Sequence, residues 1–138
     1  MKITEFKETD RAEVIALWEC CGLVVPQNDP NKDIDRKLKV NPELFLLGKT
    51  DGKIMASVMG GYEGHRGWIN YLAVDPEYRR LGHGRSLMDE VERRLRLMGC
   101  PKINLQVRES NVSVVKFYQA AGFRNDPVLS FGKRLESD

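Results

Sequence analysis

One stretch of the chain decides the fold: Tyr78-Arg79-Arg80-Leu81-Gly82-His83-Gly84-Arg85-Ser86-Leu87-Met88. It joins an apolar segment ending at Val74 to a long amphipathic segment, which predicts a turn between a strand and a helix. The G-x-G pair lets the backbone approach a ligand without Cβ clashes. The first N–H groups of the helix lack partners within it and lie at the positive end of its dipole, where phosphate binds. The arginines add positive charge, although a solvated turn would also be rich in glycine and arginine.

The length and composition predict one globular domain. A chain of 138 residues can bury a single core, and 41% hydrophobic with 30% charged residues is ordinary for a soluble protein. The longest apolar run, at 44–47, is too short to span a membrane, and residues 1–6 contain no signal-peptide core. We therefore expect a cytoplasmic protein with no membrane partner.

Charge and cysteine content exclude two further classes. The net charge of +2 comes from interleaved signs and is too small to indicate nucleic-acid binding. Cys20, Cys21 and Cys100 show no ligand spacing, so we expect no metal site and reduced thiols.

Hydrophobic periodicity predicts an element order of β-α-α-β-β-β-α-β-α-β. The expected strands cover residues 2–6, 44–49, 53–62, 68–74, 102–107 and 128–135. The first expected helix runs from Asp10 to about Gly22, the next two cover residues 30–39 and 84–98, and the last runs from Asn111 or Ser110 to Gly122. With no repeat or linker, the chain is predicted to be one mixed α/β domain over residues 1–138.

Capping and turn signals mark several of these boundaries. Asp10 and Glu13 have the spacing of a capping box, and Thr50-Asp51-Gly52 predicts a hairpin turn. Gly122 is expected to end the last helix, with Phe123 folding back as its apolar contact. In the helix over 84–98, the predicted buried stripe consists of Leu87, Val91, Leu95 and Met98.

Two motifs make the chain resemble the GNAT superfamily of acyl-CoA-dependent N-acetyltransferases. The family signature Q/R-x-x-G-x-G/A is met by Arg79 to Gly84, between the expected strand and helix. A second element, asparagine followed by an aromatic pair and Gly-Phe, is met by Asn111, Phe117-Tyr118 and Gly122-Phe123. The chain looks most similar to the small bacterial YpeA-like acetyltransferases, with shared segments at 28–30, 59–67, 99–103 and 132–135.

The resemblance implies a mostly antiparallel sheet that is splayed at the cofactor cleft, with helices on both faces. Acetyl-CoA is the expected acyl donor. Its pantetheine would bond backbone groups of Leu72 and Val74, and its pyrophosphate would bind N–H groups between Arg80 and Arg85. The implied cofactor-binding residues are Leu72, Val74, Arg79, Arg80, Leu81, Gly82, His83, Gly84, Arg85 and Asn111. A helix N-cap is an equally good use of Asn111.

The implied chemistry is direct attack of a primary amine, on a small molecule or a protein, at the thioester. A backbone N–H near Val74 would stabilise the oxyanion, as in relatives. Tyr118 matches the family tyrosine that protonates the departing CoA thiolate, and a phenol suits that task. Packing in the helix stripe is the alternative use of Tyr118.

The general base stays open at the sequence level. Gln106 stands where relatives that acetylate protein N-termini have a glutamate, and an amide cannot take up the proton. Glu63, His65, Glu109 and an ordered water are the remaining candidates.

The acceptor and the assembly are less defined. Trp18, Pro26, Asn28 and Asp29 fall where similar folds border the acceptor pocket, and Asp29 also fits an N-cap for the helix opening at Pro30. An edge strand at 128–135 is compatible with a homodimer. Alternative functions are a non-catalytic acetyl-CoA sensor and, less well supported because no G-x-x-x-x-G-K-[ST] exists, a mononucleotide-binding domain.

Overall fold

Five strands form one sheet whose spatial order is the same as their order along the chain. They are β1 (Lys2–Glu5), β2 (Phe45–Thr50), β3 (Lys53–Tyr62), β4 (Gly67–Val74) and β5 (Ile103–Asn104). The first four pair antiparallel, and β5 pairs parallel to β4. The predicted mixed, mostly antiparallel sheet is therefore confirmed.

The computed structural model describes all residues, Met1–Asp138. The chain divides into two compact units, Met1–Asn104 with Asp138, and Leu105–Ser137. The first contains the sheet and α1 (Arg11–Cys20), α2 (Pro30–Lys37) and α3 (His83–Leu97). The second contains α4 (Val112–Ala120). None of the helices combines the length and apolar character that crossing a membrane requires.

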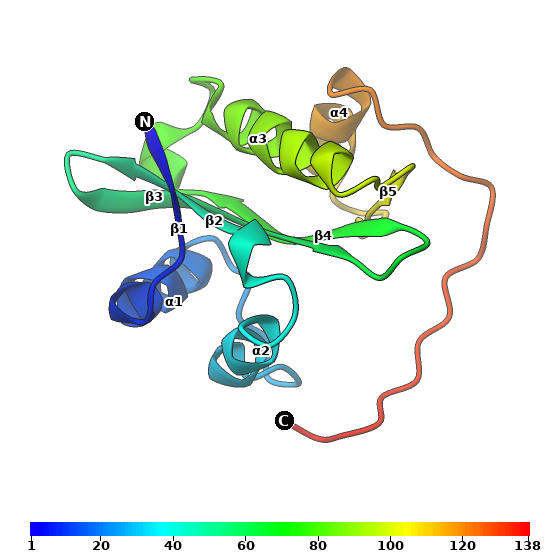
Figure 1. Ribbon diagram of the computed structural model, residues 1–138, viewed down its shortest axis with the longest axis horizontal. Helices are drawn as coiled ribbons and strands as arrows, with labels where there is room; N and C mark the ends of the chain where they lie inside the picture. The colour runs from blue at the N-terminus through cyan, green and yellow to red at the C-terminus, as the bar shows by residue number, and fades with distance from the viewer. The chain divides into compact units, whose positions relative to one another are not determined.

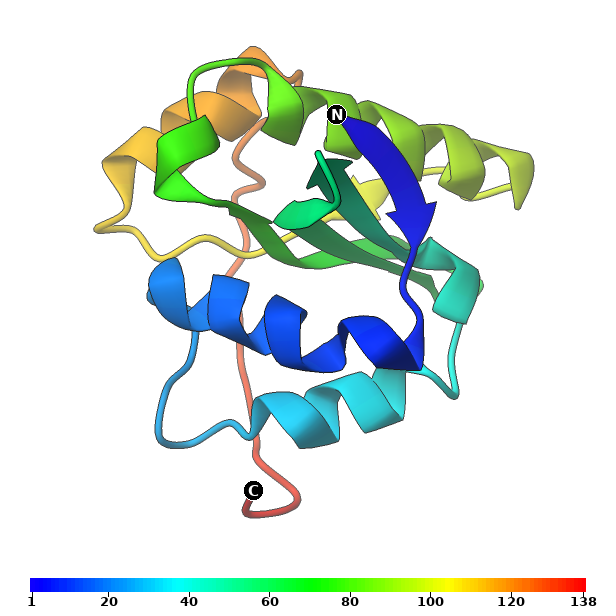
Figure 2. The ribbon, with the colours of Figure 1, turned by 90° about the vertical axis from the view of Figure 1, so that its left-hand side faces the viewer.

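The helices of the first unit lie on both faces of its sheet, as predicted. Figure 1 shows α3 over one face and α1 and α2 beneath the other. The long helix α3 packs on β2, β3 and β4, whereas α1 packs on β3 and β4. Figure 2 shows α1 and α2 running side by side. Three layers, with the sheet in the middle, thus make the core of this unit.

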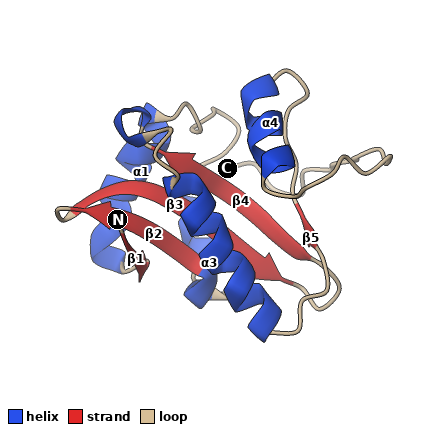
Figure 3. Cartoon of the chain, turned by 90° about the horizontal axis from the view of Figure 1, so that it is seen from above, coloured by secondary structure: helices blue, strands red, loops and turns tan.

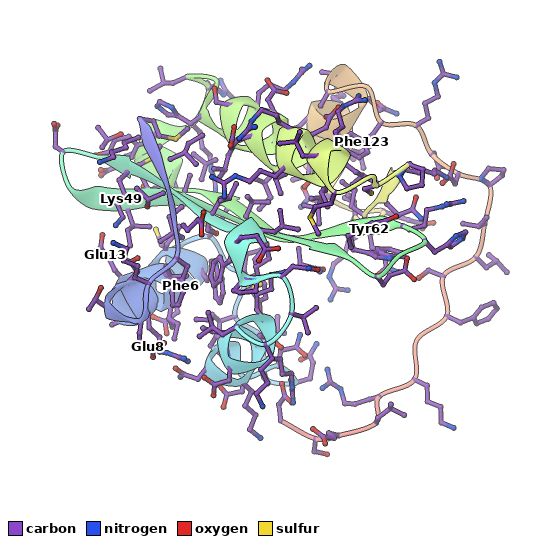
Figure 4. The ribbon with its side chains drawn as sticks, in the orientation of Figure 1. Phe6, Glu8, Glu13, Lys49, Tyr62 and Phe123 are labelled. Carbon is purple, nitrogen blue, oxygen red and sulfur yellow. The ribbon has the colours of Figure 1, made fainter.

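An aromatic column fills the core below the sheet. Phe6, labelled in Figure 4, stacks on Phe45 with ring centroids 4.5 Å apart, and Trp18 stacks on the same ring at 6.2 Å. Above the sheet, Leu87, Val91 and Leu95 are buried as predicted. Met98 is not, because the helix ends at Leu97 and Met98 is its exposed C-cap residue.

The predicted capping box at α1 is wrong. A short 3-10 turn, Glu8–Asp10, precedes the helix and gives Asp10 helical backbone angles, so its carboxylate accepts the Lys7 N–H at 2.9 Å instead. Glu13, labelled in Figure 4, accepts the Ile54 N–H on β3 at 2.6 Å. Both carboxylates therefore bind backbone groups other than those that the predicted Asp10–Glu13 capping box requires.

Two predicted strands differ from the structure. The segment expected at 102–107 pairs only at Ile103 and Asn104, and the segment at 128–135 is neither strand nor helix. Its apolar residues Val128, Leu129, Phe131 and Leu135 are exposed. The second unit contains no strand, and β-propensity alone does not form one without a partner.

The end of α4 follows the prediction. Gly122 adopts a left-handed φ of 96°, and the Phe123 N–H donates to the Tyr118 carbonyl at 3.0 Å. The Phe123 ring returns to the Tyr118 ring at 5.5 Å. This is the Schellman arrangement with its apolar contact.

Candidate active site

A β-bulge interrupts β4 near its end. Ser57 pairs with Ala73 and Met59 pairs with Asn70, so that one residue of β3 opposes two residues, Tyr71 and Leu72, of β4. Tyr71 has a left-handed φ of 51°, which is uncommon for an aromatic residue. Such a conformation costs about 1–3 kcal/mol and persists only where the surroundings impose it.

The contacts that impose it come from three elements. The Trp18 ring stacks on the Tyr71 ring at 3.9 Å. The Ser57 hydroxyl donates to the Tyr71 carbonyl at 2.8 Å and accepts from Trp18 Nε1 at 2.9 Å. The Tyr71 hydroxyl donates to Asp33 Oδ2 at 2.6 Å. Burial and the Asp33 carboxylate raise the pKa of Tyr71, so its phenol stays neutral.

The edge of β4 beyond the bulge is open. The ladder with β5 consists of Gly67 with Ile103 and Trp68 with Asn104, after which no strand pairs with that edge of β4 (Figure 3). Leu72 and Val74, the predicted pantetheine contacts, lie on this unpaired part. The Val74 carbonyl already accepts from Arg79 Nε at 2.9 Å and from Cys21 Sγ at 3.4 Å. This edge of β4 is therefore without a strand partner beside Leu72 and Val74.

The turn after β4 leaves a helix N-terminus without a side-chain cap. Arg80 and Gly82 have left-handed φ values of 64° and 82°, and Gly82 is the N-cap of α3. The first backbone bond of the helix runs from the Ser86 N–H to the Gly82 carbonyl at 3.0 Å. A glycine offers no side-chain acceptor, and the first turn of α3 holds no acidic residue. The N–H groups that open the helix are therefore suited to an anion.

The positive side chains of this turn differ in their contacts. Arg79 folds back onto the end of β4, as described above, and Arg85 forms an ion pair with Asp89 at 3.3 Å. Arg79, Arg80, Leu81 and Arg85 are exposed, while His83 and Gly84 are half-buried. The turn thus presents mobile positive charge beside the uncapped N–H groups.

The second unit carries the other two predicted residues. Asn111 is the N-cap of α4, but its side chain caps no backbone N–H, and its Oδ1 accepts from Ser113 Oγ at 3.4 Å. Tyr118 is buried and meets the rings of Phe117 at 5.1 Å and Phe123 at 5.5 Å edge-on. Burial raises the pKa of Tyr118 to about 12.

The candidate bases differ in what their side chains bind. Glu63 Oε1 accepts the N–H groups of His65, at 2.6 Å, and Arg66, and these bonds lower the pKa of Glu63 and make it a weaker base. Glu63 and His65 lie in the loop before β4, and the bulge begins four residues into that strand, roughly 13 Å along it at about 3.3 Å per residue. Glu109 is exposed in the second unit.

Sequence reasoning missed the residues that hold the bulge, which are Ser57, Tyr71 and Asp33. Ser57 is a polar residue in an otherwise apolar strand, and that was the available signal. The left-handed φ of Tyr71 has no sequence signal, because glycine or asparagine would normally mark it. Asp29 was correctly predicted as an N-cap, since its carboxylate accepts the Asn31 N–H at 2.9 Å.

Comparison with known proteins places the chain among relatives of one kind. The sequence profile of the acetyltransferase (GNAT) family matches residues 11–123. A protein from Yersinia pestis (strain Pestoides F), described as an acetyltransferase, is 46% identical over 138 residues, covering 100% of this chain and 98% of that protein. An acetyltransferase from Sodalis glossinidius is 47% identical over 139 residues, with the same coverage.

Solved structures share the fold. An aminoglycoside acetyltransferase, AAC(6')-Iy, in complex with a bisubstrate analogue superposes with a TM-score of 0.79 at 19% identity, covering 96% of this chain and 97% of its own. The ribosomal-protein-S18-alanine N-acetyltransferase from Escherichia coli has a TM-score of 0.77 at 22% identity, covering 91% and 78%.

Proposed function

Because the chain belongs to the acetyltransferase (GNAT) family and is an acetyltransferase, we propose that it moves an acetyl group from acetyl-CoA to a primary amine of a small molecule or protein. One observation carries the choice of donor. The open edge of β4 is followed in the chain, after a 3-10 turn at Pro76–Tyr78 and a short loop, by a helix N-terminus whose cap has no side chain. An extended amide chain ending in phosphates, such as CoA, matches the free strand edge and the anion site in that order.

The phosphates are assigned to the turn from Arg79 to Arg85. The N–H groups that open α3 bind the pyrophosphate, and the exposed guanidinium groups of Arg80 and Arg85 add charge-assisted contacts. The pantetheine is assigned to backbone groups of Leu72 and Val74 and to Asn111. Relatives that are acetyltransferases and a similar structure bound to a CoA conjugate support this assignment.

The proposed reaction is direct transfer. The amine nitrogen attacks the thioester carbonyl carbon, the C–S bond breaks, the amine loses a proton, and the departing thiolate gains one. Tyr118 is the proposed proton donor to the thiolate. With a pKa of about 12 against about 8.5 for an ordinary thiol, its phenol is protonated at neutral pH and first donates a hydrogen bond to the developing thiolate.

No side chain is assigned as the base. Glu63 is disfavoured as the base, because its carboxylate binds its own loop and its pKa is lowered. His65, Glu109 and an ordered water remain predictions for the base.

A homodimer and a cytoplasmic location also remain predictions. The three free cysteines are compatible with a reducing compartment.

Calorimetric titration with acetyl-CoA, CoA and dephospho-CoA, run with an assay of thiol release over an amine and peptide panel, tests the proposal. We expect acetyl-CoA to bind and the Arg79→Ala/Arg80→Ala variant to bind at least tenfold more weakly. Arg93→Ala/Arg96→Ala is the matched control, since both arginines are exposed on α3 and paired within it. Binding without thiol release for any acceptor would favour the sensor, and no binding would remove the assignment of CoA to this turn.

A further inference from the structure

Ser57 is a fully buried hydroxyl in the middle of β3. A buried hydroxyl is costly unless it is hydrogen-bonded, and this one makes two bonds, to Trp18 Nε1 and to the Tyr71 carbonyl. The indole can only donate, so it occupies a lone pair of Ser57 Oγ. The hydroxyl proton of Ser57 is thereby directed at the Tyr71 carbonyl.

That carbonyl belongs to the same peptide plane as the Leu72 N–H. The peptide is trans, and in a trans peptide the C=O and N–H point in opposite directions. Ser57, on β3, holds the Tyr71 C=O at 2.8 Å. The Leu72 N–H therefore points away from Ser57 and β3, on the stretch of β4 that β5 leaves unpaired.

From this geometry we propose that Ser57 is a positioning residue, which holds the Leu72 N–H so that it donates to the acyl carbonyl oxygen of the thioester. The inference rests on the proposed function and moves the oxyanion donor from the region of Val74, where the sequence analysis expected it, to Leu72. As the amine attacks, negative charge develops on that oxygen, and a donor held in place stabilises it without reorganisation.

The bulge makes the restraint necessary. Tyr71 sits at a left-handed φ of 51°, a conformation that its own preferences do not hold. The Trp18 ring stacks on both Tyr71 and Phe45, and this packing keeps Nε1 in position to donate to Ser57 Oγ. Without the hydroxyl, the Tyr71–Leu72 peptide loses the bond that sets its rotation.

Steady-state kinetics of Ser57→Ala provide the first test. We expect kcat to fall by roughly 10- to 100-fold, which is a smaller decrease than the complete removal of an oxyanion donor causes. The KM for acetyl-CoA and the Kd for CoA, which has no acyl oxygen, should stay within about threefold, since the phosphate contacts and the proposed pantetheine contacts at Val74 and Asn111 do not involve the Tyr71–Leu72 peptide. Trp18→Phe, which leaves the hydroxyl on the Tyr71 carbonyl, should lower kcat less than Ser57→Ala does.

Glu13→Ala is the matched control. It removes another side-chain bond to β3, the one to the Ile54 N–H at 2.6 Å, three residues before Ser57 and outside the bulge. It should lower the melting temperature while leaving kcat per CoA-binding site unchanged. An equal loss of kcat in both variants would mean that Ser57 acts only through stability and would overturn the proposal.

An NMR measurement tests the same inference without an amine acceptor. In the wild type, the Leu72 amide proton should move downfield with acetyl-CoA and not with CoA, and this difference should vanish in Ser57→Ala. Wild-type protein that binds both and shows the same Leu72 shift with each would overturn the inference while leaving the proposed function standing. Failure to bind acetyl-CoA would overturn the proposed function first, and the inference with it.

Discussion

Tyr71 is half-buried and Tyr118 is buried, and the contacts of their hydroxyl groups suit the two residues to different tasks. The Tyr71 hydroxyl is bound to the Asp33 carboxylate at 2.6 Å and holds its residue in place. The pKa of Tyr118 is raised by burial alone, to about 12. Only a phenol whose proton is not already committed to a carboxylate suits proton donation to a leaving group, and that favours Tyr118 as the acid.

Tyr118→Phe should lower kcat by roughly 100-fold or more, with little change in the Kd of CoA, because it removes a donor used in the transition state. Since the folded pKa lies above the ordinary value of about 10, the wild-type rate should show no alkaline decline from this group below about pH 10. Stopped-flow thiol release across pH checks both points. Tyr62→Phe, which removes a hydroxyl bonded to Gly64, is the control, and an active Tyr118→Phe would exclude the acid role.

Lys37 carries a stability prediction. Its Nζ donates to the Gly60 carbonyl, and burial lowers its pKa to about 8, with Glu43 acting in the opposite direction. The unfolded chain holds that proton more tightly, so the free energy of unfolding gains a contribution as pH rises from about 8 towards 10.4. Urea unfolding should therefore show that the free energy of unfolding of the wild type rises relative to that of Lys37→Met over that pH range. If the difference between the two free energies does not change with pH, the lowered pKa is contradicted.

At the scale of elements, patterns with a local cause were predictable and patterns with a distant cause were not. The Thr50-Asp51-Gly52 turn and the end of α4 follow from residues that tolerate left-handed angles, and both were predicted. Asp10 and Glu13 have capping-box spacing, but the Glu13 carboxylate on α1 accepts its hydrogen bond from the Ile54 N–H on β3. The bulge at Tyr71 depends on Trp18 and Ser57, far away in sequence, so no local signal announced it.

Gly60 lets α3 approach β3. A Cβ there would lie 2.6 Å from Val91 Cγ2, whereas one on Gly61 would lie 3.8 Å from its nearest neighbour, Lys37 Nζ. Gly60→Ala should therefore cost about 1–3 kcal/mol of unfolding free energy through overpacking, and Gly61→Ala much less. Chemical denaturation of the pair measures this, and equal stabilities would show that α3 is not held at this distance.

Gly82 couples the start of α3 to anion binding. Asp and Asn are similar in size and both tolerate its left-handed φ of 82°, but only Asp places a negative charge beside the first N–H groups. Gly82→Asp should weaken acetyl-CoA binding about tenfold, or 1.4 kcal/mol, more than Gly82→Asn. Calorimetry that gives equal affinities for the two variants would place the phosphates elsewhere.

At the scale of the whole molecule, the fold class was predictable because two motifs and the element order agree. The mostly antiparallel sheet and the helices on both of its faces follow the prediction. Residues 128–135 were predicted as a strand, yet a strand exists only where a neighbour completes its ladder, and the second unit offers none. The acceptor depends on loop shape, and alternation and motif spacing carry no information about that shape.

Ligand binding should appear as global stabilisation. At a hundredfold excess over Kd, acetyl-CoA adds about 2.7 kcal/mol, which corresponds to a Tm increase of roughly 5–10 °C for a chain of this size. Differential scanning fluorimetry should show this shift for the wild type and a smaller one for Gly82→Asp at the same concentration. A shift that survives Gly82→Asp unchanged would mean that the ligand stabilises the protein from another site.

The stacking of Trp18 on Tyr71 at the bulge also makes intrinsic tryptophan fluorescence sensitive to this part of the protein. The chain has two tryptophans, Trp18 buried against Tyr71 and Trp68 exposed where β4 leaves β5. In a Trp68→Phe variant, the wavelength and lifetime of tryptophan emission come from Trp18 alone, whose Nε1–H donates to Ser57 Oγ. Changes in the surroundings of Trp18 at the bulge can then be followed in real time and without a dye while substrates bind and leave.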